Sequence, residues 1–378
     1  MIPRTTAADA PRLGQAPTVI HVDTERGWRG GERQVLWLAQ SLPRDRFRSI
    51  VAGRPGEPLL DRSAAAGIPV VPLTPFAEFD ALAALRLREV CRREHVSLVH
   101  AHTAHAVGLA ALALTRTNVR LVVTRRVDFP LRANPATRWK YRRADALIAI
   151  SSAVAGVLTA SGIPRERIEI VPSGVDLTRQ VLPASSDVLA ALGVPRGAPL
   201  VVQVAQLVPH KDPLTFVRAI AAVRDARPDV HALLVGDGPL REAVVALVAE
   251  LELQSVLHVT GYRTDADALL AAGEVVTLSS REEGLGTVLL DALALGKPVA
   301  ATRAGGIGEI VEDGRSGRLV GVGDGAALGR AIDDYLGELD DPSRRAAIAA
   351  AARQRAAEFS IERTADATAA VYEKVLAP

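Results

Sequence analysis

Short runs of β-branched residues alternate with longer Ala-, Leu- and Arg-rich segments along nearly the whole of this 378-residue chain. The longer segments have the apolar periodicity of amphipathic helices, so each run and the segment after it predict a strand followed by a helix. Strands that alternate with helices in this way are typical of βαβ units and a parallel sheet. We therefore expect an α/β fold.

The runs fall into two series, separated by a Pro-, Ser- and Gly-rich passage at residues 183–199. The first series predicts strands at residues 19–23, 49–52, 70–73, 98–102, 121–124, 147–150 and 168–171. The second predicts strands at residues 200–205, 231–235, 257–260, 275–278, 299–302 and 319–322. The chain is also too long for one core of the usual size. We expect two Rossmann-like parallel-sheet domains that face each other across a cleft, because ligands bind outside the carboxyl ends of parallel strands.

The domain bounds follow from these series. We predict a disordered leader at residues 1–16, a first domain at 17–182, a second domain at 183–357 and a C-terminal helix at 358–378. Residues 342–376 have the composition of a helix with a break near Phe359 and Ser360. Because no strand follows this helix, we expect its last part to pack back on the first domain.

Composition excludes several classes of protein. Hydrophobic residues make up 48% of the chain and aromatic residues only 3%, so the cores must consist of Ala, Val, Leu and Ile. The single cysteine, Cys91, excludes an intramolecular disulfide and indicates a reducing, cytoplasmic location. No apolar stretch reaches the ~18 residues of a membrane-spanning helix, and the leader lacks the apolar segment of a signal peptide. A formal net charge of +2 gives no indication of nucleic-acid binding.

The densest cluster of candidate site residues is Glu283-Gly284-Leu285-Gly286-Thr287, between the strand predicted at 275–278 and an amphipathic helix. Its glycines let backbone N–H groups approach a ligand, and the helix N-terminus favours an anion such as a diphosphate. Glu283 is out of place beside an anion unless it binds hydroxyl groups, for which a sugar is the natural source. Asp291, further along the helix, would reach a second pair such as a ribose diol. The alternative is that Glu283 only caps the helix and that Asp291 is solvated.

A second cluster follows the strand predicted at 200–205 and contains Gln206 and Lys211. The chain has only four lysines, because its positive charge is mostly arginine, so a lysine in a strand-end loop is conspicuous. An ammonium group is a compact point charge that suits a diphosphate oxygen. The alternative is a solvated lysine that caps the next helix.

Glycine pairs mark two more strand-end turns. Gly30 and Gly31 lie in a flexible loop ahead of a helix predicted at residues 33–41. The pair lets this loop close over a ligand and present N–H groups to phosphate from the opposite side of the cleft. Gly236 and Gly238 follow the strand predicted at 231–235 and, with the turn at 261–263, would sandwich a nucleobase. Plain tight turns fit these glycines equally well.

Three histidines lie at and after the end of the strand predicted at 98–102. His100 and His102 share one face of that strand, so at least one points into the cleft. Metal binding by these two and His105 is disfavoured, because no acidic or thiol ligand accompanies them and His105 leaves the strand. We expect no bound metal ion, and instead a neutral histidine that bonds a sugar hydroxyl.

Positive charge is concentrated between Arg116 and Arg143, a segment that contains Arg125, Arg126 and one acidic residue, Asp128. Its interleaved aromatic residues are Phe129, Trp139 and Tyr141. Such a patch attracts a phosphorylated acceptor or anionic lipid headgroups, the latter by roughly 1 kcal/mol per residue at a membrane surface. A solvated arginine-rich face is the alternative.

Taken together, these motifs resemble the retaining glycosyltransferases of family 4, which have the two-domain GT-B fold, from about residue 19 to residue 372. They occur in the family's order, along with the segments 148–151, 171–176 and 305–309. The resemblance implies that the first domain is the acceptor side and that the second binds the nucleotide sugar. It implies that Lys211 contacts the donor diphosphate, Glu283 the donor sugar, Asp291 the ribose and His102 a sugar hydroxyl near the reacting carbon. Backbone N–H groups would come from Gly284, Leu285, Gly286 and Thr287.

Two positions depart from the family's pattern. Gln206 stands where the family usually has Arg, which removes one positive charge from the diphosphate site. Arg125 or Arg126 would substitute for that charge from across the cleft. Asp291 stands where the family usually has Glu, so its side chain is one methylene shorter.

The resemblance implies a hexosyltransferase that moves a sugar from a nucleotide-diphosphate sugar to a hydroxyl acceptor, with a cell-envelope lipid or glycan precursor as the expected acceptor. Positive charge and oriented dipoles would stabilise the leaving group, so we expect no metal or other cofactor. The expected location is cytoplasmic, peripheral on the inner face of the cytoplasmic membrane. Two alternatives are a GT-B nucleotide-sugar epimerase and a catalytically weak nucleotide-sugar-binding protein. A nicotinamide dehydrogenase is disfavoured, because no Gly-X-Gly-X-X-Gly follows a strand with an acidic residue at the proper distance.

Overall fold

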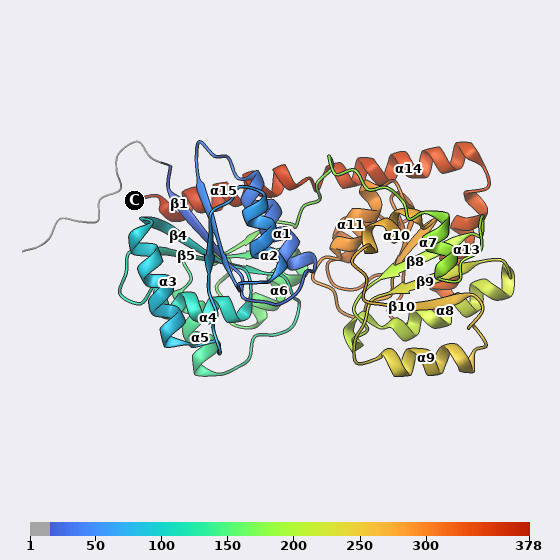
Figure 1. The fold of residues 1–378 in the computed structure, drawn as a ribbon, viewed down its shortest axis with the longest axis horizontal. Coiled ribbons are helices and arrows are strands. Elements are labelled where there is room, and N and C mark those ends of the chain that lie inside the picture. Colours follow the sequence, from blue (N-terminus) through green and yellow to red (C-terminus); the bar gives the residue numbers. More distant parts are fainter. Residues whose placement is uncertain (1–15) are drawn as a thin grey trace, which may run out of the picture.

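Two α/β units stand side by side in the computed structural model, which describes residues 16–378 (Figure 1). The leader predicted for residues 1–16 lies outside this range, except for residue 16. The N-terminal sheet has seven strands in the order β3-β2-β1-β4-β5-β6-β7, and the C-terminal sheet has six in the order β10-β9-β8-β11-β12-β13. All neighbouring strands in both sheets are parallel. The predicted fold of two parallel-sheet α/β domains is confirmed.

Every predicted run overlaps the strand that forms there. The N-terminal strands are β1 (Thr18–Val22), β2 (Arg48–Gly53), β3 (Val70–Pro72), β4 (Val96–Ala101), β5 (Arg120–Arg125), β6 (Ala146–Ala149) and β7 (Ile168–Ile170). The C-terminal strands are β8 (Leu200–Val204), β9 (His231–Val235), β10 (Leu257–Gly261), β11 (Val275–Leu278), β12 (Val299–Thr302) and β13 (Arg318–Val320).

Helices connect the strands and cover both faces of each sheet. In the N-terminal unit they are α1 (Gly30–Ser41), α2 (Pro58–Ala65), α3 (Ala81–Arg93), α4 (Ala104–Ala113), α5 (Pro135–Arg143), α6 (Ser152–Ala160) and the 3-10 turn η1 (Arg165–Arg167). In the C-terminal unit they are α7 (Ser186–Ala191), η2 (Pro209–Lys211), α8 (Pro213–Ala226), α9 (Arg241–Glu250), α10 (Ala266–Ala272), α11 (Thr287–Ala294), α12 (Ile307–Ile310), α13 (Gly325–Glu338) and α14 (Pro342–Ala357). The last helix is α15 (Ile361–Leu376).

Short polar side chains fix where several helices begin. Asp80 accepts a hydrogen bond from the amide of Ala83 at 3.0 Å, and Ser151 accepts one from Val154 at 3.1 Å. Each bond satisfies an amide of the first helical turn that has no partner within the helix. The helices after β3 and β6 therefore start immediately beyond the strand-end loops.

Alternation along β1 divides the N-terminal core into two layers. Ile20 and Val22 belong to a cluster that includes residues of α3 and α4, whereas Val19 belongs to one that includes residues of α1 and α15. Successive side chains of a strand point to opposite faces, so α3 and α4 pack on one face of the sheet at β1, and α1 and α15 pack on the other. The fully buried side chains are mostly Ala, Val, Leu and Ile, as the composition predicts; Tyr141 and Tyr372 are large exceptions.

The chain crosses between the two units twice, at one place. Val175 donates to the carbonyl oxygen of Phe359 at 2.8 Å, and Ile361 donates to that of Val175 at 3.0 Å. A Cβ at Gly174 would lie 2.6 Å from the Cα of Ile361, so only glycine permits this crossing. The helix break predicted near Phe359 and Ser360 is confirmed.

The last helix returns to the first unit. Helix α14 packs on α11, and α15 packs on α1 and against β4 and β5 (Figure 1). The domain bounds at residues 17, 183 and 358 stay a prediction. Within residues 16–378 no helix combines the length and the apolar character needed to cross a membrane.

Candidate active site

Strand-end loops of the two units meet across the boundary, and glycines permit the contact. A Cβ at Gly284, after β11, would lie 2.2 Å from the carbonyl oxygen of Arg126, after β5. A Cβ at Gly30 would lie 3.0 Å from the hydroxyl oxygen of Thr287, the first residue of α11. Larger side chains at either glycine would push the loops apart. The predicted meeting of loops from both sheets is therefore a direct contact.

A carboxylate from the C-terminal unit caps a helix of the N-terminal unit. Glu309, in α12, accepts hydrogen bonds from the amides of Ser152 at 2.8 Å and Ala153 at 3.0 Å, at the start of α6. A helix N-terminus carries partial positive charge and amides without helical partners, so the carboxylate stabilises it. This contact adds hydrogen bonds between the two units to the loop contacts at Gly284 and Gly30.

Lys211 and Glu283 lie in one cluster. Lys211 ends η2, and its ammonium group forms an ion pair with the carboxylate of Glu283. The hydroxyl of Ser280 donates to the same carboxylate at 3.2 Å. The carbonyl oxygen of His210 accepts hydrogen bonds from the amides of residues 281 and 282 at 2.8 and 3.2 Å. Two motifs that lie 72 residues apart in the sequence are thus in contact.

Helix α11 begins beside this cluster. Its N-cap, Gly286, has φ 87°, a left-handed conformation that favours glycine, and no side chain caps the helix. Leu285 is buried in the core, so only its backbone, and not its side chain, can face a ligand. An uncapped helix N-terminus next to Lys211 is an arrangement that binds phosphate groups. The neighbouring turns of Gly236 and Gly238 are tight, because a Cβ there would lie 1.9 and 2.5 Å from backbone oxygens of the loop after β8.

The conformation of Gly30 and Gly31 differs from the predicted flexible loop. Helix α1 begins at Gly30 rather than at residue 33, so the two glycines form its first turn and not a flexible loop. The cause is a capping box at Arg29, in which the carboxylate of Glu32 accepts a hydrogen bond from the amide of Arg29 at 2.8 Å. The glycines therefore present a helix N-terminus to the boundary, opposite the start of α11.

Asp291 is buried and paired. Its side chain is 5% exposed, and its carboxylate forms an ion pair with Arg33 of α1. Burial raises the pKa of Asp291, and the positive charge of Arg33 opposes this rise. The alternative of a solvated helix residue at this position is therefore wrong. Arg33 was not singled out by the sequence, since nothing in its local pattern shows which residue of the other unit it meets.

The chain contains one Asp-X-Asp sequence, Asp265-Ala266-Asp267, the pattern of metal-dependent transferases. Arg263 forms two hydrogen bonds with Asp265, both at 2.7 Å. Asp267 pairs with Arg33 at 3.3 Å and with Arg179 at 2.9 Å. Guanidinium groups therefore occupy the oxygens that a metal ion would need.

His102 lies in a buried chain of hydrogen bonds. Its Nδ1 faces the guanidinium of Arg126 at 3.2 Å, and its Nε2 faces Nδ1 of His21 at 3.1 Å. Because Arg126 can only donate, we assign the proton of His102 to Nε2. Burial lowers the pKa of His102 well below its usual value, so the ring is neutral. Both ring nitrogens are occupied, and the contact between His102 and a sugar hydroxyl stays a prediction that requires one bond to be exchanged.

The three histidines that lie together in the structure are not the three that the sequence suggested. His21, His100 and His102 lie together, whereas His105 is exposed and pairs with Glu25 at 3.4 Å. His21 is the register partner of His100 on the adjacent strand β1, a neighbour that the sequence does not reveal. The nitrogens of His100 bond the hydroxyls of Tyr372 at 2.5 Å and Thr124 at 2.6 Å. His100 would have to lose one of these bonds to ligate a metal.

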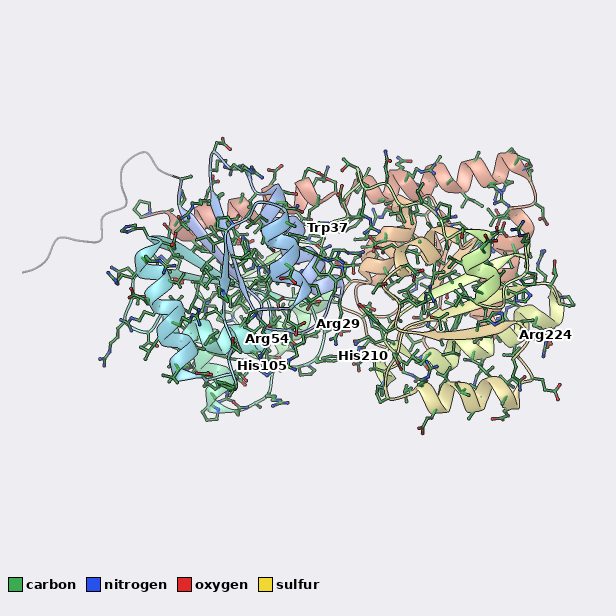
Figure 2. The ribbon with its side chains drawn as sticks, in the orientation of Figure 1. Arg29, Trp37, Arg54, His105, His210 and Arg224 are labelled. Carbon is green, nitrogen blue, oxygen red and sulfur yellow. The ribbon has the colours of Figure 1, made fainter. Side chains whose placement is uncertain are left out.

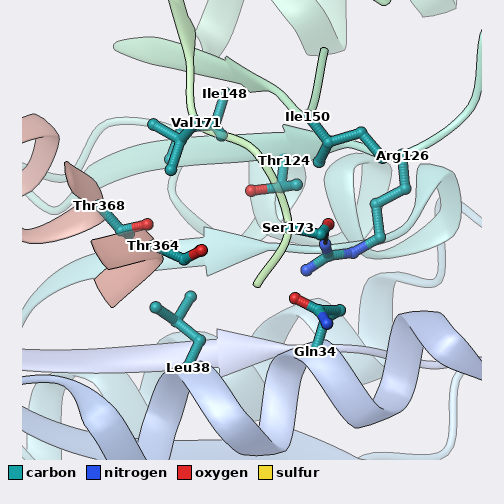
Figure 3. Close-up of a pocket in the computed structure, with 10 residues that line it drawn as sticks. All are labelled: Gln34, Leu38, Thr124, Arg126, Ile148, Ile150, Val171, Ser173, Thr364 and Thr368. Carbon is teal, nitrogen blue, oxygen red and sulfur yellow. Dashed lines mark hydrogen bonds between the residues drawn. The ribbon is translucent and has the colours of Figure 1, made fainter. Parts of the chain in front are cut away.

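Arg125 and Arg126 have different surroundings. Arg125 donates to the carbonyl oxygens of Val127 at 3.2 Å and Phe129 at 2.6 Å, so it is engaged in shaping its own loop. Arg126 donates to the hydroxyl of Ser173 at 3.3 Å, and burial lowers its pKa to about 10. Its guanidinium lines a cavity of about 20 Å³, drawn in Figure 3, which has room for about one water molecule and not for a sugar.

The basic segment is only partly on the surface. Lys140 is buried and pairs with Glu78, and Tyr141 is buried in the core. Phe129 packs edge to face on His210 of the other unit, with ring centroids 5.3 Å apart. Figure 2 shows His210 at the boundary between the units. Of the three aromatic residues expected in the patch, Trp139 is the exposed one.

Each unit matches a model of a known family. The model of glycosyltransferase family 4 matches residues 28–179, and that of the group 1 glycosyl transferases matches residues 187–355. The 2-deoxystreptamine glucosyltransferase of Streptomyces kanamyceticus is 33% identical over 258 residues, which span 66% of this chain and 66%, just under two thirds, of that protein. A D-inositol 3-phosphate glycosyltransferase of Rhodococcus erythropolis is 31% identical over 321 residues, 76% of this chain and 70% of that protein.

The solved structure of Anabaena HepE in complex with UDP-glucose has a similar fold. Its TM-score is 0.79 at 24% sequence identity, over 94% of this chain and 99% of that one. A lipopolysaccharide core biosynthesis glycosyltransferase of Rhizobium meliloti, LpsE, is 28% identical over 67% of this chain and 69% of that protein. With the two matched models, these relatives show that the chain belongs to the family 4, group 1 glycosyltransferases, with the GT-B fold.

Proposed function

We propose that this protein is a retaining glycosyltransferase that moves a sugar from a nucleotide-diphosphate sugar to a hydroxyl acceptor. The observation that carries the proposal is the single cluster of Lys211, Glu283 and the uncapped start of α11, at the boundary of the two units. A cation and helix amides suit a diphosphate, and a carboxylate beside them suits sugar hydroxyls. The names of the relatives, which are sugar transferases, support the same reaction class.

To bind at this cluster, the donor must break the ion pair between Lys211 and Glu283. In the proposed complex the diphosphate takes the ammonium group of Lys211, and Glu283 turns to accept hydrogen bonds from sugar hydroxyls. As the bond between sugar and diphosphate breaks, negative charge develops on the leaving oxygen. Lys211 and the first amides of α11 stabilise that charge, which is the role of a metal ion in other transferases. The acceptor hydroxyl then attacks from the face that the diphosphate leaves and gives its proton to the leaving phosphate oxygen, so the configuration is retained.

A face of the N-terminal unit supports an acceptor held at a membrane. Phe76 is 92% exposed and Leu82 is 79% exposed, and Leu85 is exposed one turn further along α3. The rings of Phe79 and Trp139 lie 6.1 Å apart and join the start of α3 to α5. Exposed apolar groups of this size mark sites of interaction with proteins or membranes.

Arginines accompany this apolar face. Arg86 on α3 and Arg138 and Arg142 on α5 are exposed. Apolar side chains that enter the headgroup region, together with arginines that attract anionic lipids, favour an anionic membrane surface. We therefore propose a peripheral location on the inner face of the cytoplasmic membrane, with a cell-envelope lipid or glycan precursor as acceptor. The name of the relative in lipopolysaccharide core synthesis supports this acceptor class.

Vesicle sedimentation tests the membrane proposal. Wild-type protein should pellet with vesicles that contain phosphatidylglycerol and stay in solution with phosphatidylcholine alone. The double variant Leu82→Ser, Leu85→Ser should lose most of this binding. The control Val245→Ser changes an exposed apolar residue on α9 of the other unit and should bind as the wild type does. Equal binding by the double variant would exclude α3 as the contact.

A panel of nucleotide sugars tests the reaction. A donor at one hundred times its dissociation constant adds about 2.7 kcal/mol to the free energy of unfolding, so the right donor raises the melting temperature clearly. That donor, incubated with an envelope lipid extract, should release free nucleoside diphosphate and give a product of unchanged anomeric configuration by NMR. Epimerised donor in the absence of acceptor would favour an epimerase. Donor binding without turnover on any extract would favour a binding protein.

A further inference from the structure

An arginine of the N-terminal unit lies inside the candidate donor site of the C-terminal unit. Arg33, in α1, pairs with Asp291 in α11 and approaches Asp267 in α10 at 3.3 Å. The Arg33 side chain is 13% exposed and the Asp291 side chain 5%. This contact is therefore a buried ion pair between the two units. Loss of either partner would leave the other charge buried without compensation.

Aromatic and ionic neighbours fix the position of this arginine. Trp37, one turn further along α1, lies 4.7 Å from the Arg33 guanidinium carbon, measured to the ring centroid. Arg179 lies 5.9 Å from the same ring and pairs with Asp267 at 2.9 Å. Figure 2 shows Trp37 on the N-terminal unit close to the boundary. A guanidinium that rests on an aromatic ring and reaches two carboxylates has little rotational freedom.

Asp291 depends on Arg33 for its charge and orientation. Among the side-chain hydrogen bonds of residues 16–378, the carboxylate of Asp291 accepts from Arg33 alone, through Oδ2. Its other oxygen, Oδ1, remains available. Because burial disfavours the charged form, Asp291 without Arg33 would take up a proton more readily. A neutral carboxyl group is a weaker acceptor of hydrogen bonds than a carboxylate.

We propose that Arg33 is a positioning residue for the donor nucleotide, which holds the carboxylate of Asp291 so that its second oxygen accepts a ribose hydroxyl. The inference rests on the proposed function, in which Asp291 contacts the ribose. Arg33 and Asp291 belong to different units, so recognition of the ribose then requires the two units to be in contact. The nucleotide is bound fully only where the acceptor side has closed on the donor side.

Calorimetry with ribonucleotides and their 2′,3′-dideoxy counterparts tests this inference. The probes are UDP, GDP and ADP, and the wild type should bind one of them more tightly than its dideoxy form. Arg33→Gln should weaken the ribonucleotide about tenfold and leave the dideoxy form unchanged, so that the preference is lost. Arg33→Lys keeps the charge and should restore part of the preference. The control Arg179→Gln removes a neighbouring cation whose charge also favours the Asp291 carboxylate but which does not bond it, so the preference should fall less than in Arg33→Gln.

The outcomes separate the inference from the proposed function. If Arg33→Gln keeps or strengthens the preference for the ribonucleotide, the inference is wrong and the proposed function stands. Equal weakening of both nucleotide forms would indicate a purely structural role and also overturn the inference. If the wild type binds a ribonucleotide no more tightly than its dideoxy form, the inference is wrong. If it binds none of the three ribonucleotides and the panel of nucleotide sugars finds no donor either, the proposed function fails and the inference fails with it. Should Arg33→Gln not fold, the Arg33→Lys variant carries the same comparison, and a preference equal to that of the wild type overturns the inference.

Discussion

Alanine at Gly284 should separate the two units and reduce turnover. A Cβ at this position would lie 2.2 Å from the carbonyl oxygen of Arg126, whereas real Cβ contacts are essentially never below 3.0 Å. The two loops must therefore move apart by roughly 1 Å. Overpacking of this kind typically costs about 1–3 kcal/mol. A displacement of about 1 Å at reacting groups can lower a rate about 100-fold. We expect kcat/KM to fall by that order while the fold is kept.

The assay compares Gly284→Ala with the wild type and with Gly308→Ala. Gly308 lies in α12 of the same unit, and a Cβ there meets nothing closer than 4.0 Å, so the control should be fully active. Urea unfolding measures the loss of stability separately from the loss of rate. The reasoning is refuted if Gly284→Ala has wild-type kcat/KM, because the loops of residues 126 and 284 would then not be in contact during the reaction.

Three further predictions concern charge. Lys211→Ala should lower kcat by about 100-fold or more with little change in fold, because it removes the cation proposed for the leaving diphosphate; steady-state rates on the donor found by screening check this. Turnover should survive EDTA, since arginines occupy Asp265 and Asp267; full loss restored by manganese would contradict metal independence. Burial lowers the pKa of His21 from 6.5 to about 3, so its contribution to stability is present above pH 6.5 and lost as the pH falls towards 3. In His21→Gln, the free energy of unfolding from urea titrations should fall less steeply between pH 6.5 and 3, by about 1.4 kcal/mol per pH unit. A slope equal to that of the wild type would argue against a neutral buried His21.

The fold was predictable because its signal is local and repeated. A run such as residues 231–235 is short, β-branched or aliphatic, and followed by a glycine turn, and it forms β9 at the predicted bounds. The break at Phe359 and Ser360 also has a local cause, since Ser360 caps the next helix through the amide of Arg363 at 3.4 Å. The start of α1 was missed, because a Gly-Gly pair normally indicates a loop and the capping box of Arg29 and Glu32 outweighs that tendency.

The partners of the site residues were not predictable from the sequence. Lys211 and Glu283 each stand out by position, but only the packing of β8 beside β11 brings their loops together. His21 carries no motif, and its contact with His102 depends on the register of β1 against β4. Arg33 and Asp291 are 258 residues apart and on different units. Contacts of this kind follow from topology and domain placement, which the local pattern does not encode.

Both carboxylates proposed for the donor are already paired with cations in the ligand-free protein. Glu283 pairs with Lys211 within one unit, and Asp291 pairs with Arg33 across the boundary. An unpaired buried carboxylate would be costly, so these pairs stabilise the empty site. The donor must exchange the first pair, because its diphosphate and its sugar compete for the two partners, whereas it can share the second by using the free oxygen of Asp291. The donor therefore has to break only one of the two ion pairs. The free-energy cost of binding falls mainly on the pair of Lys211 and Glu283, and the pair of Arg33 and Asp291 stays intact.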